Sequence, residues 1–181
     1  MQILNCRVNL RETILAEHSK AQTNLIIKWI VNSQQRFDEL FDLFLQDEYR
    51  VVQRAAWPLS YVAIAHPHLI SKHLNKLLKN LNHPKLPGAV KRNTVRLLQE
   101  ITIPKRFHAA VMNLCFDYIT SPDEAPAVKA FSLTILQNLS KQYPGIKQEL
   151  KTIIEDRWDY ESPAFKSRAK KILSENSHKT F

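Results

Sequence analysis

The sequence predicts an all-α protein in which about five helix pairs stack into a right-handed α–α superhelix, that is, an α solenoid. A segment recurs with a spacing of 37 or 38 residues, and within each copy the apolar positions follow the period of a half-buried helix. Proline placement supports the same scheme, because eight of the nine prolines fall at expected helix ends or turns. Pro58 alone lies inside an expected helix.

The internal repeat defines the second helix of each pair. Residues 89–101 align with residues 127–139 and share a Val-Lys pair and a Leu-Gln pair, and residues 164–174 give a third copy. Residues 51–63 and 18–30 fit the same columns more loosely. A spacing of this length is typical of stacked helical repeats, so we expect these five segments to pack side by side.

Another amphipathic run precedes most of these segments, and we expect it to form the first helix of the pair. Such runs lie at residues 37–45, 70–81, 107–118 and 146–154. We therefore expect one repeat domain over residues 1–181, with repeats at roughly 8–33, 36–66, 68–103, 105–143 and 145–175.

The composition excludes several kinds of chemistry. Two glycines are too few for a glycine-rich phosphate loop or a dinucleotide-binding turn, and we expect no cofactor. Cys6 and Cys115 have no CxxC partner and are expected to be reduced, packed thiols of an intracellular protein. No apolar run reaches the length of a membrane span, so we expect a soluble cytoplasmic protein that does not bind membranes.

The charge is uneven along the chain. The formal net charge is +9, and no acidic residue occurs between Glu48 and Glu100. A positive field in this stretch favours association with nucleic acids, acidic proteins or anionic surfaces. Four histidines also lie there, but no acidic residue or cysteine could complete a metal site with them, so we expect surface histidines: His66, His68, His73 and His83.

The repeats resemble the HEAT/armadillo superfamily, whose copies carry an Asp in the turn followed by Val-Arg or Val-Lys. Asp47 and Asp123 keep that spacing, whereas Lys85 replaces the Asp ahead of Val90. Three strings, at residues 18–23, 49–57 and 90–98, are similar to a family of bacterial HEAT-like proteins, and that likeness covers nearly the whole chain. Members are sometimes labelled adenylosuccinate lyase, but the Ser-rich, Gly-containing signature loop of such lyases is absent from this sequence.

One column of the repeat holds a polar side chain just outside the apolar stripe in every pair: Lys20, Gln53, Lys91, Lys129 and Lys166. The four lysines of this column form either a binding row for anions or a ladder of ion pairs between repeats, as the resemblance implies for the equivalent Arg. Arg54, Arg92 and Arg96 have no partner encoded in the repeat, and Trp57 lies next to the unusual Pro58. The candidate binding residues are therefore Arg54, Trp57, Lys91, Arg92, Arg96 and Lys129.

These observations favour a non-catalytic scaffold or protein-interaction module that binds an acidic protein segment on the inner face formed by the second helices. Nucleic-acid binding is the alternative, because aligned cations can also neutralise phosphates. Some bacterial alkylpurine DNA glycosylases are HEAT-like, and that resemblance extends the alternative to base excision. The Trp-x-x-Asp arrangement that this activity would require is missing from the second helices, and no pair of carboxylates for acid–base chemistry is evident.

Overall fold

The computed structural model describes residues 9–177, with side chains described as far as residue 174. No β-strand occurs in this part of the chain, which confirms the all-α prediction. Cys115 is buried, whereas Cys6 lies outside the described residues. Contacts between Cα atoms divide the chain into two compact units, unit 1 ending at Leu97 and unit 2 beginning at Leu98.

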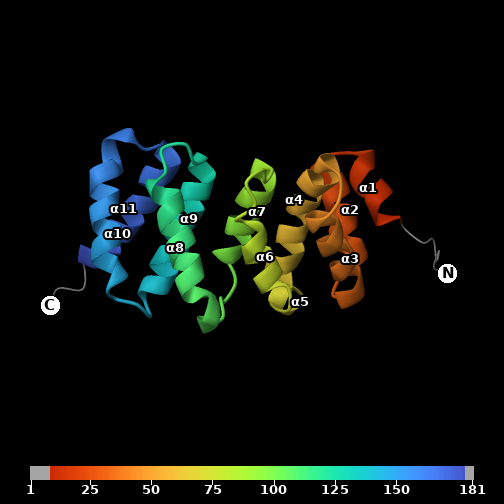
Figure 1. The fold of residues 1–181 in the computed structure, drawn as a ribbon, viewed down its shortest axis with the longest axis horizontal. Coiled ribbons are helices and arrows are strands. Elements are labelled where there is room, and N and C mark those ends of the chain that lie inside the picture. The colour runs from red at the N-terminus through yellow and green to blue at the C-terminus, as the bar shows by residue number, and fades with distance from the viewer. Residues whose placement is uncertain (1–8, 178–181) are drawn as a thin grey trace. The chain divides into compact units, whose positions relative to one another are not determined.

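Unit 1 is built from three successive helix pairs, and the helices of neighbouring pairs lie side by side in Figure 1. The three pairs are α1 (Leu10–Ala16) with α2 (Lys20–Ile30), α3 (Gln34–Leu45) with α4 (Tyr49–Ala65), and α5 (Pro67–Ser71) and α6 (Leu74–Asn80) with α7 (Gly88–Leu98), whose last residue falls in unit 2. Helix α4 packs against α1, α2 and α3 and is the central element of this unit.

The core of unit 1 follows the apolar stripes. Phe37, Phe41 and Phe44 of α3 are fully buried, as are Val51 and Ala55 of α4. Burying aromatic side chains of this size contributes strongly to stability, since truncating one in a core costs about 3–5 kcal/mol. Ser19 and Ser33 are the N-cap residues of α2 and α3. Their side chains accept hydrogen bonds from backbone N–H groups in the first turn of each helix.

One expected helix of unit 1 is broken. The sequence predicted a continuous first helix over residues 70–81, but α5 ends at Ser71 and α6 begins at Leu74. The break lies at Lys72 and His73, whose side chains both reach Asp38 of α3, and the His73 ring stacks on Phe41 at 4.2 Å between centroids. His73 is also 9% exposed, so the expectation of a surface histidine was wrong here, because a tertiary contact draws this side chain inward.

Unit 2 contains two further pairs, α8 (His108–Thr120) with α9 (Pro126–Ser140), and α10 (Ile146–Arg157) with α11 (Pro163–Ser177). Short 3-10 helices, η1 (Lys105–Phe107) and η2 (Trp158–Tyr160), precede α8 and α11. Helix α9 packs against α8, α10 and α11, and its apolar residues are buried among them. Pro126 and Pro163 occupy the first positions of α9 and α11, where the missing N–H of proline costs nothing.

Pro58 lies inside α4, as the repeat predicted, and it is buried. Among residues 9–177, no helix is both long and apolar enough to cross a membrane.

Candidate functional site

The exposed side of α4 brings together a cation and two aromatic residues. Arg54, Trp57 and Tyr61 are three and four residues apart, so they share one face of the helix. The Arg54 guanidinium donates a hydrogen bond of 2.7 Å to the backbone carbonyl of Leu15. This contact attaches α4 to the C-terminal end of α1 and gives Arg54 a structural role at the edge of the site.

Trp57 is half-buried between two other rings. Its ring centroid lies 5.9 Å from that of His18, in an edge-on arrangement, and 6.4 Å from that of Tyr61. Aromatic pairs at such distances stabilise one another. The indole is therefore fixed in position, although part of it remains at the surface.

Tyr61 connects α4 with α7. The guanidinium carbon of Arg96 lies 4.2 Å from the centroid of the Tyr61 ring, which is a cation–π contact. Hydrogen bonding by Arg96, and then by Trp57, lowers the pKa of the Tyr61 hydroxyl, and the charges of Arg96 and Lys20 act in the same direction. Tyr61 is 39% exposed, so solvent and a partner can both reach it.

Two further cations flank this contact. Arg92 lies one helical turn before Arg96 on α7 and is exposed, and Lys20 is exposed at the start of α2. No ion pair between described residues involves Lys20, Arg92 or Arg96. We call this surface of unit 1 the α4–α7 patch and define it as His18, Lys20, Arg54, Trp57, Tyr61, Arg92 and Arg96.

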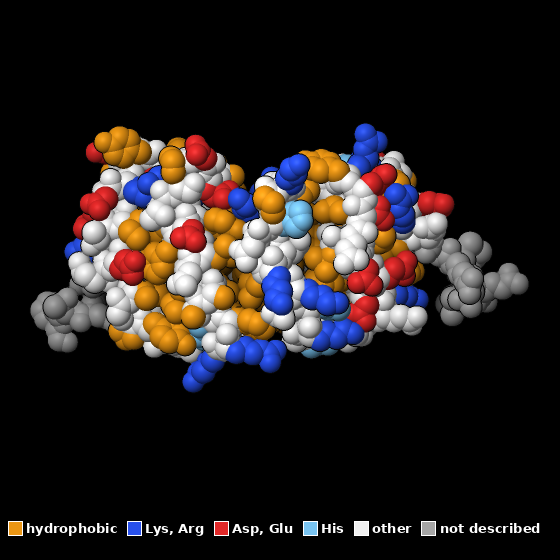
Figure 2. Space-filling view, viewed as in Figure 1, with side chains coloured by type: hydrophobic (Ala, Val, Ile, Leu, Met, Phe, Trp, Pro, Cys, Tyr) orange, Lys and Arg blue, Asp and Glu red, His pale blue; other side chains and the backbone are white. Residues whose placement is uncertain are grey.

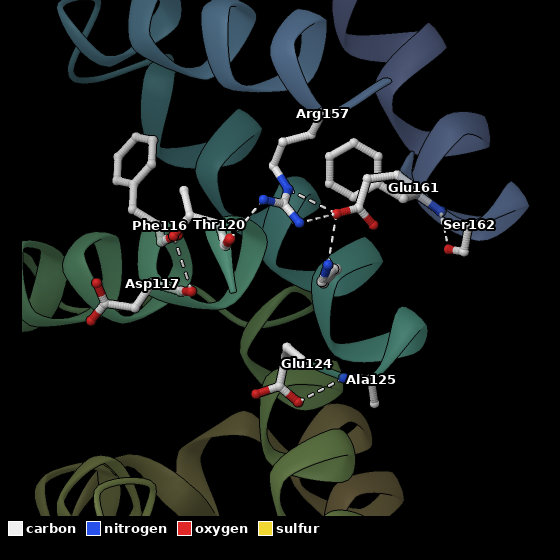
Figure 3. Close-up of polar contacts among 10 residues, drawn as sticks. Phe116, Asp117, Thr120, Glu124, Ala125, Arg157, Glu161 and Ser162 are labelled. Carbon is white, nitrogen blue, oxygen red and sulfur yellow. Dashed lines mark hydrogen bonds and ion pairs between the residues drawn. The ribbon is translucent and has the colours of Figure 1, made fainter. Parts of the chain in front are cut away.

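Lys129, another expected binding residue, lies in unit 2 and is buried rather than exposed. Its ammonium group is 2.6 Å from the Glu161 carboxylate, and both side chains are 4% exposed. Arg157 also reaches Glu161, at 2.8 Å, and donates a hydrogen bond to the Thr120 carbonyl, as Figure 3 shows. A cation enclosed in this way presents no charge to a partner.

The acid in this network is ionised despite its burial. Removal from water opposes ionisation of Glu161, but hydrogen bonds from Lys129 and Arg157 outweigh that effect, and the pKa of the carboxyl lies below its usual value. The geometry is that of an ion pair between neighbouring repeats. This is the ladder-type contact that the sequence allowed for this column, as opposed to an exposed binding row.

The remaining members of the column differ from Lys129. Lys91 is half-buried near the start of α7 and is not a free charge. Gln53 is half-buried and uncharged, and the Lys166 ammonium lies 5.9 Å from the ring centroid of Trp158. The column therefore does not form an unbroken row of exposed cations.

A second polar cluster in unit 1 surrounds Asp38. Its carboxylate lies 2.7 Å from the Lys72 ammonium and 2.6 Å from the His73 ring, and it accepts a hydrogen bond from Gln34. Figure 2 shows basic side chains, in blue, in the region of α5 and α6, near acidic side chains, in red, in the region of α3. Within residues 9–177 no set of three or more His, Cys, Asp or Glu side chains could hold a metal ion.

The sequence analysis missed Tyr61 and His18. Tyr61 follows Trp57 by four residues, so helical spacing alone could have placed the two side chains together. His18 precedes α2 and reaches Trp57 only through the packing of α2 on α4, for which the sequence carries no local signal.

The fold defines a helical-repeat protein, in which successive antiparallel helix pairs supply one shared core within each unit. The chain belongs to the HEAT repeat family, since the model of the HEAT repeat domain matches residues 10–176. This match confirms the resemblance that the repeats indicated. No curated protein and no solved structure matches the chain.

Proposed function

We propose that the protein is a non-catalytic scaffold that binds an acidic protein segment through the α4–α7 patch. HEAT repeats generally mediate protein–protein interactions, and repeat arrays use the surface of their stacked helices for this purpose. The observation that carries the proposal is the group of cations without carboxylate partners, Lys20, Arg92 and Arg96, around the exposed ring of Tyr61.

The chemistry of the patch suits carboxylates. Arginine presents a planar set of N–H donors that matches a carboxylate, and pairs of this kind are stronger than hydrogen bonds between neutral groups. Arginine and aromatic side chains are also the residue types enriched at protein interfaces, where they account for much of the binding energy.

A protein partner is favoured over a nucleic acid because the repeated column does not form a continuous row of free cations. A phosphate backbone is bound by a series of cations, and affinity depends on how many phosphates they neutralise. Here Gln53 interrupts the repeated column, and the Lys129 charge is enclosed with Glu161. The free cations suit a short acidic segment better than a continuous polyanion.

Binding of a fluorescently labelled oligoglutamate peptide, followed by anisotropy at low and high salt, tests the proposal. We expect the double substitution Arg92→Glu/Arg96→Glu to weaken binding by about tenfold or more, because each replaced cation removes an attraction and adds a repulsion. The matched control is Lys170→Glu/Lys171→Glu in α11, which makes the same change in net charge at two exposed lysines of unit 2.

Equal loss of affinity in both variants would mean that only net charge matters, and the patch would not be the binding site. If the protein binds a short labelled DNA duplex with a steep dependence on salt, and binds oligoglutamate no better than oligoglutamine, the nucleic-acid alternative replaces the proposal.

A further inference from the structure

Tyr61 is an exposed aromatic residue of the α4–α7 patch, and its ring has a neighbour on two sides. Arg96 covers its ring at 4.2 Å, and the Trp57 ring lies 6.4 Å away. The phenol oxygen is thereby held where α4 and α7 meet, with 39% of the residue still exposed.

The unused hydrogen-bond donors of Tyr61 and Arg96 favour the same kind of ligand. The Tyr61 oxygen accepts hydrogen bonds from Arg96 and Trp57, and no described residue accepts the one hydrogen that its hydroxyl carries. A guanidinium stacked on a ring still has N–H groups at its edge, and Arg96 has no carboxylate partner in the described part of the chain. A group that only accepts hydrogen bonds and carries negative charge would satisfy both side chains.

We propose that Tyr61 and Arg96 together bind one side-chain carboxylate of the acidic partner, with the Tyr61 hydroxyl and the Arg96 guanidinium donating to its two oxygens. This inference rests on the proposed function and adds a defined contact point and a residue that determines specificity. Trp57 is a positioning residue, since its ring packs beside Tyr61 and restricts how the phenol can turn.

Arg92 and Lys20 contribute differently in this arrangement. Both are exposed, and the cation stacked on the Tyr61 ring is Arg96. They raise the local positive potential and speed the encounter with an acidic segment, whereas Tyr61 and Arg96 fix the position of one carboxylate.

Tyr61→Phe tests this contact because it removes the hydroxyl and keeps the ring under Arg96. With an oligoglutamate peptide amidated at its C-terminus, we expect affinity to fall about tenfold, as the loss of a hydrogen bond to a charged group implies. Tyr49→Phe is the matched control, since Tyr49 lies on the same helix and is 64% exposed, and it should bind like the wild type.

A second measurement separates binding from structure. In NMR spectra of protein labelled in its tyrosine rings, the signal absent from Tyr61→Phe identifies Tyr61. A carboxylate that accepts the hydroxyl hydrogen stabilises the protonated phenol and repels the phenolate, so adding peptide should raise the pKa of Tyr61. A purely structural role for Tyr61 would leave that pKa unchanged.

The outcomes distinguish the two proposals. If the wild type binds oligoglutamate no better than oligoglutamine, the proposed function fails. If it binds oligoglutamate, but Tyr61→Phe binds equally well and the pKa of Tyr61 does not rise, only the inference about this contact fails. If oligoglutamine with a free C-terminus binds and depends on Tyr61, whereas amidated oligoglutamate does not, the assignment to a side-chain carboxylate is overturned.

Discussion

In unit 2 the ammonium group of Lys129 lies 2.6 Å from the Glu161 carboxylate and is hidden from solvent, whereas in unit 1 Arg92 and Arg96 remain on the surface without a carboxylate partner. Both arrangements use cations from second helices of the repeat. Lys129 belongs to the repeated column of the sequence, whereas Arg92 and Arg96 lie outside it. Glu161 comes 32 residues after Lys129, and at the same offset from Gln53 the chain has Lys85 instead of an acid.

This comparison shows that cations on the second helices of the repeat do not all have the same surroundings. Where the next turn supplies an acid, the charge is neutralised and joins adjacent helix pairs. Arg92 and Arg96 have no carboxylate within ion-pair distance among the described residues and remain at the surface, where we propose that a partner binds. Breaking a buried pair leaves an uncompensated charge, whereas changing an exposed cation affects folding little, so the two regions should respond differently to substitution.

The largest effect should come from the buried acid of unit 2. Glu161→Gln leaves the Lys129 ammonium enclosed without a counterion, and we expect the free energy of unfolding to fall by about 3–5 kcal/mol. Urea denaturation followed by circular dichroism measures this. Replacing both partners, as in Lys129→Met/Glu161→Met, should restore part of the loss. A change below about 1 kcal/mol for the single variant would show that the pair is no buried network.

A smaller effect is expected for Asp38 in unit 1, and it should depend on pH. Burial opposes ionisation, but hydrogen bonds from Lys72 and His73 prevail and lower the pKa of Asp38 to about 2, from an ordinary value of 3.8. A lowered pKa stabilises the folded state above the unfolded pKa, and this stabilisation is lost as pH falls through the folded one. Asp38→Asn should therefore reduce stability at neutral pH by about 1 kcal/mol, allowing for solvent screening.

The pH profile provides the check on that prediction. Stability curves of wild type and Asp38→Asn should converge between about pH 4 and pH 2, where the wild-type carboxyl becomes protonated. Parallel curves over this range would show that the carboxylate charge contributes nothing. Glu161 also has a lowered pKa, so Asp38→Asn keeps an acid-sensitive component that comes from unit 2.

The smallest effect should follow from giving unit 1 the arrangement of unit 2. Gln53→Lys/Lys85→Glu places a cation and an acid at the positions equivalent to Lys129 and Glu161. Because Gln53 is half-buried and Lys85 exposed, we expect a gain of only about 0.5 kcal/mol in the free energy of unfolding. The single variants provide the control. A gain that is merely the sum of the two singles would show that no ion pair forms.

Much of the fold could be predicted from periodicity. The spacing of apolar residues located the second helices α4, α7, α9 and α11, because a helix buries one stripe and that stripe has a fixed period. The break between α5 and α6 could not be read in this way. It coincides with contacts of His73 to Asp38 and Phe41, which lie about one repeat earlier in the chain.

The candidate site was only partly predictable. Arg54, Arg92 and Arg96 became candidates through their charge and Trp57 through its place next to Pro58, and Arg92 and Arg96 are surface cations without ion-pair partners in the described residues. The sequence could not separate them from Lys129, because a lysine beside an apolar stripe looks the same whether or not an acid lies next to it. Tyr61 was missed because an exposed tyrosine acquires its role only through the guanidinium stacked upon it.

The sequence by itself determined that this chain folds into repeated helix pairs and carries a surplus of positive charge, since periodicity and composition are local or additive properties. The tertiary structure alone decided which cations are neutralised and which are exposed. Lys129 meets Glu161, and Arg96 meets Tyr61, only when separate helices pack together. The effect of a charge depends on the groups within a few ångströms of it, and that neighbourhood is set by packing.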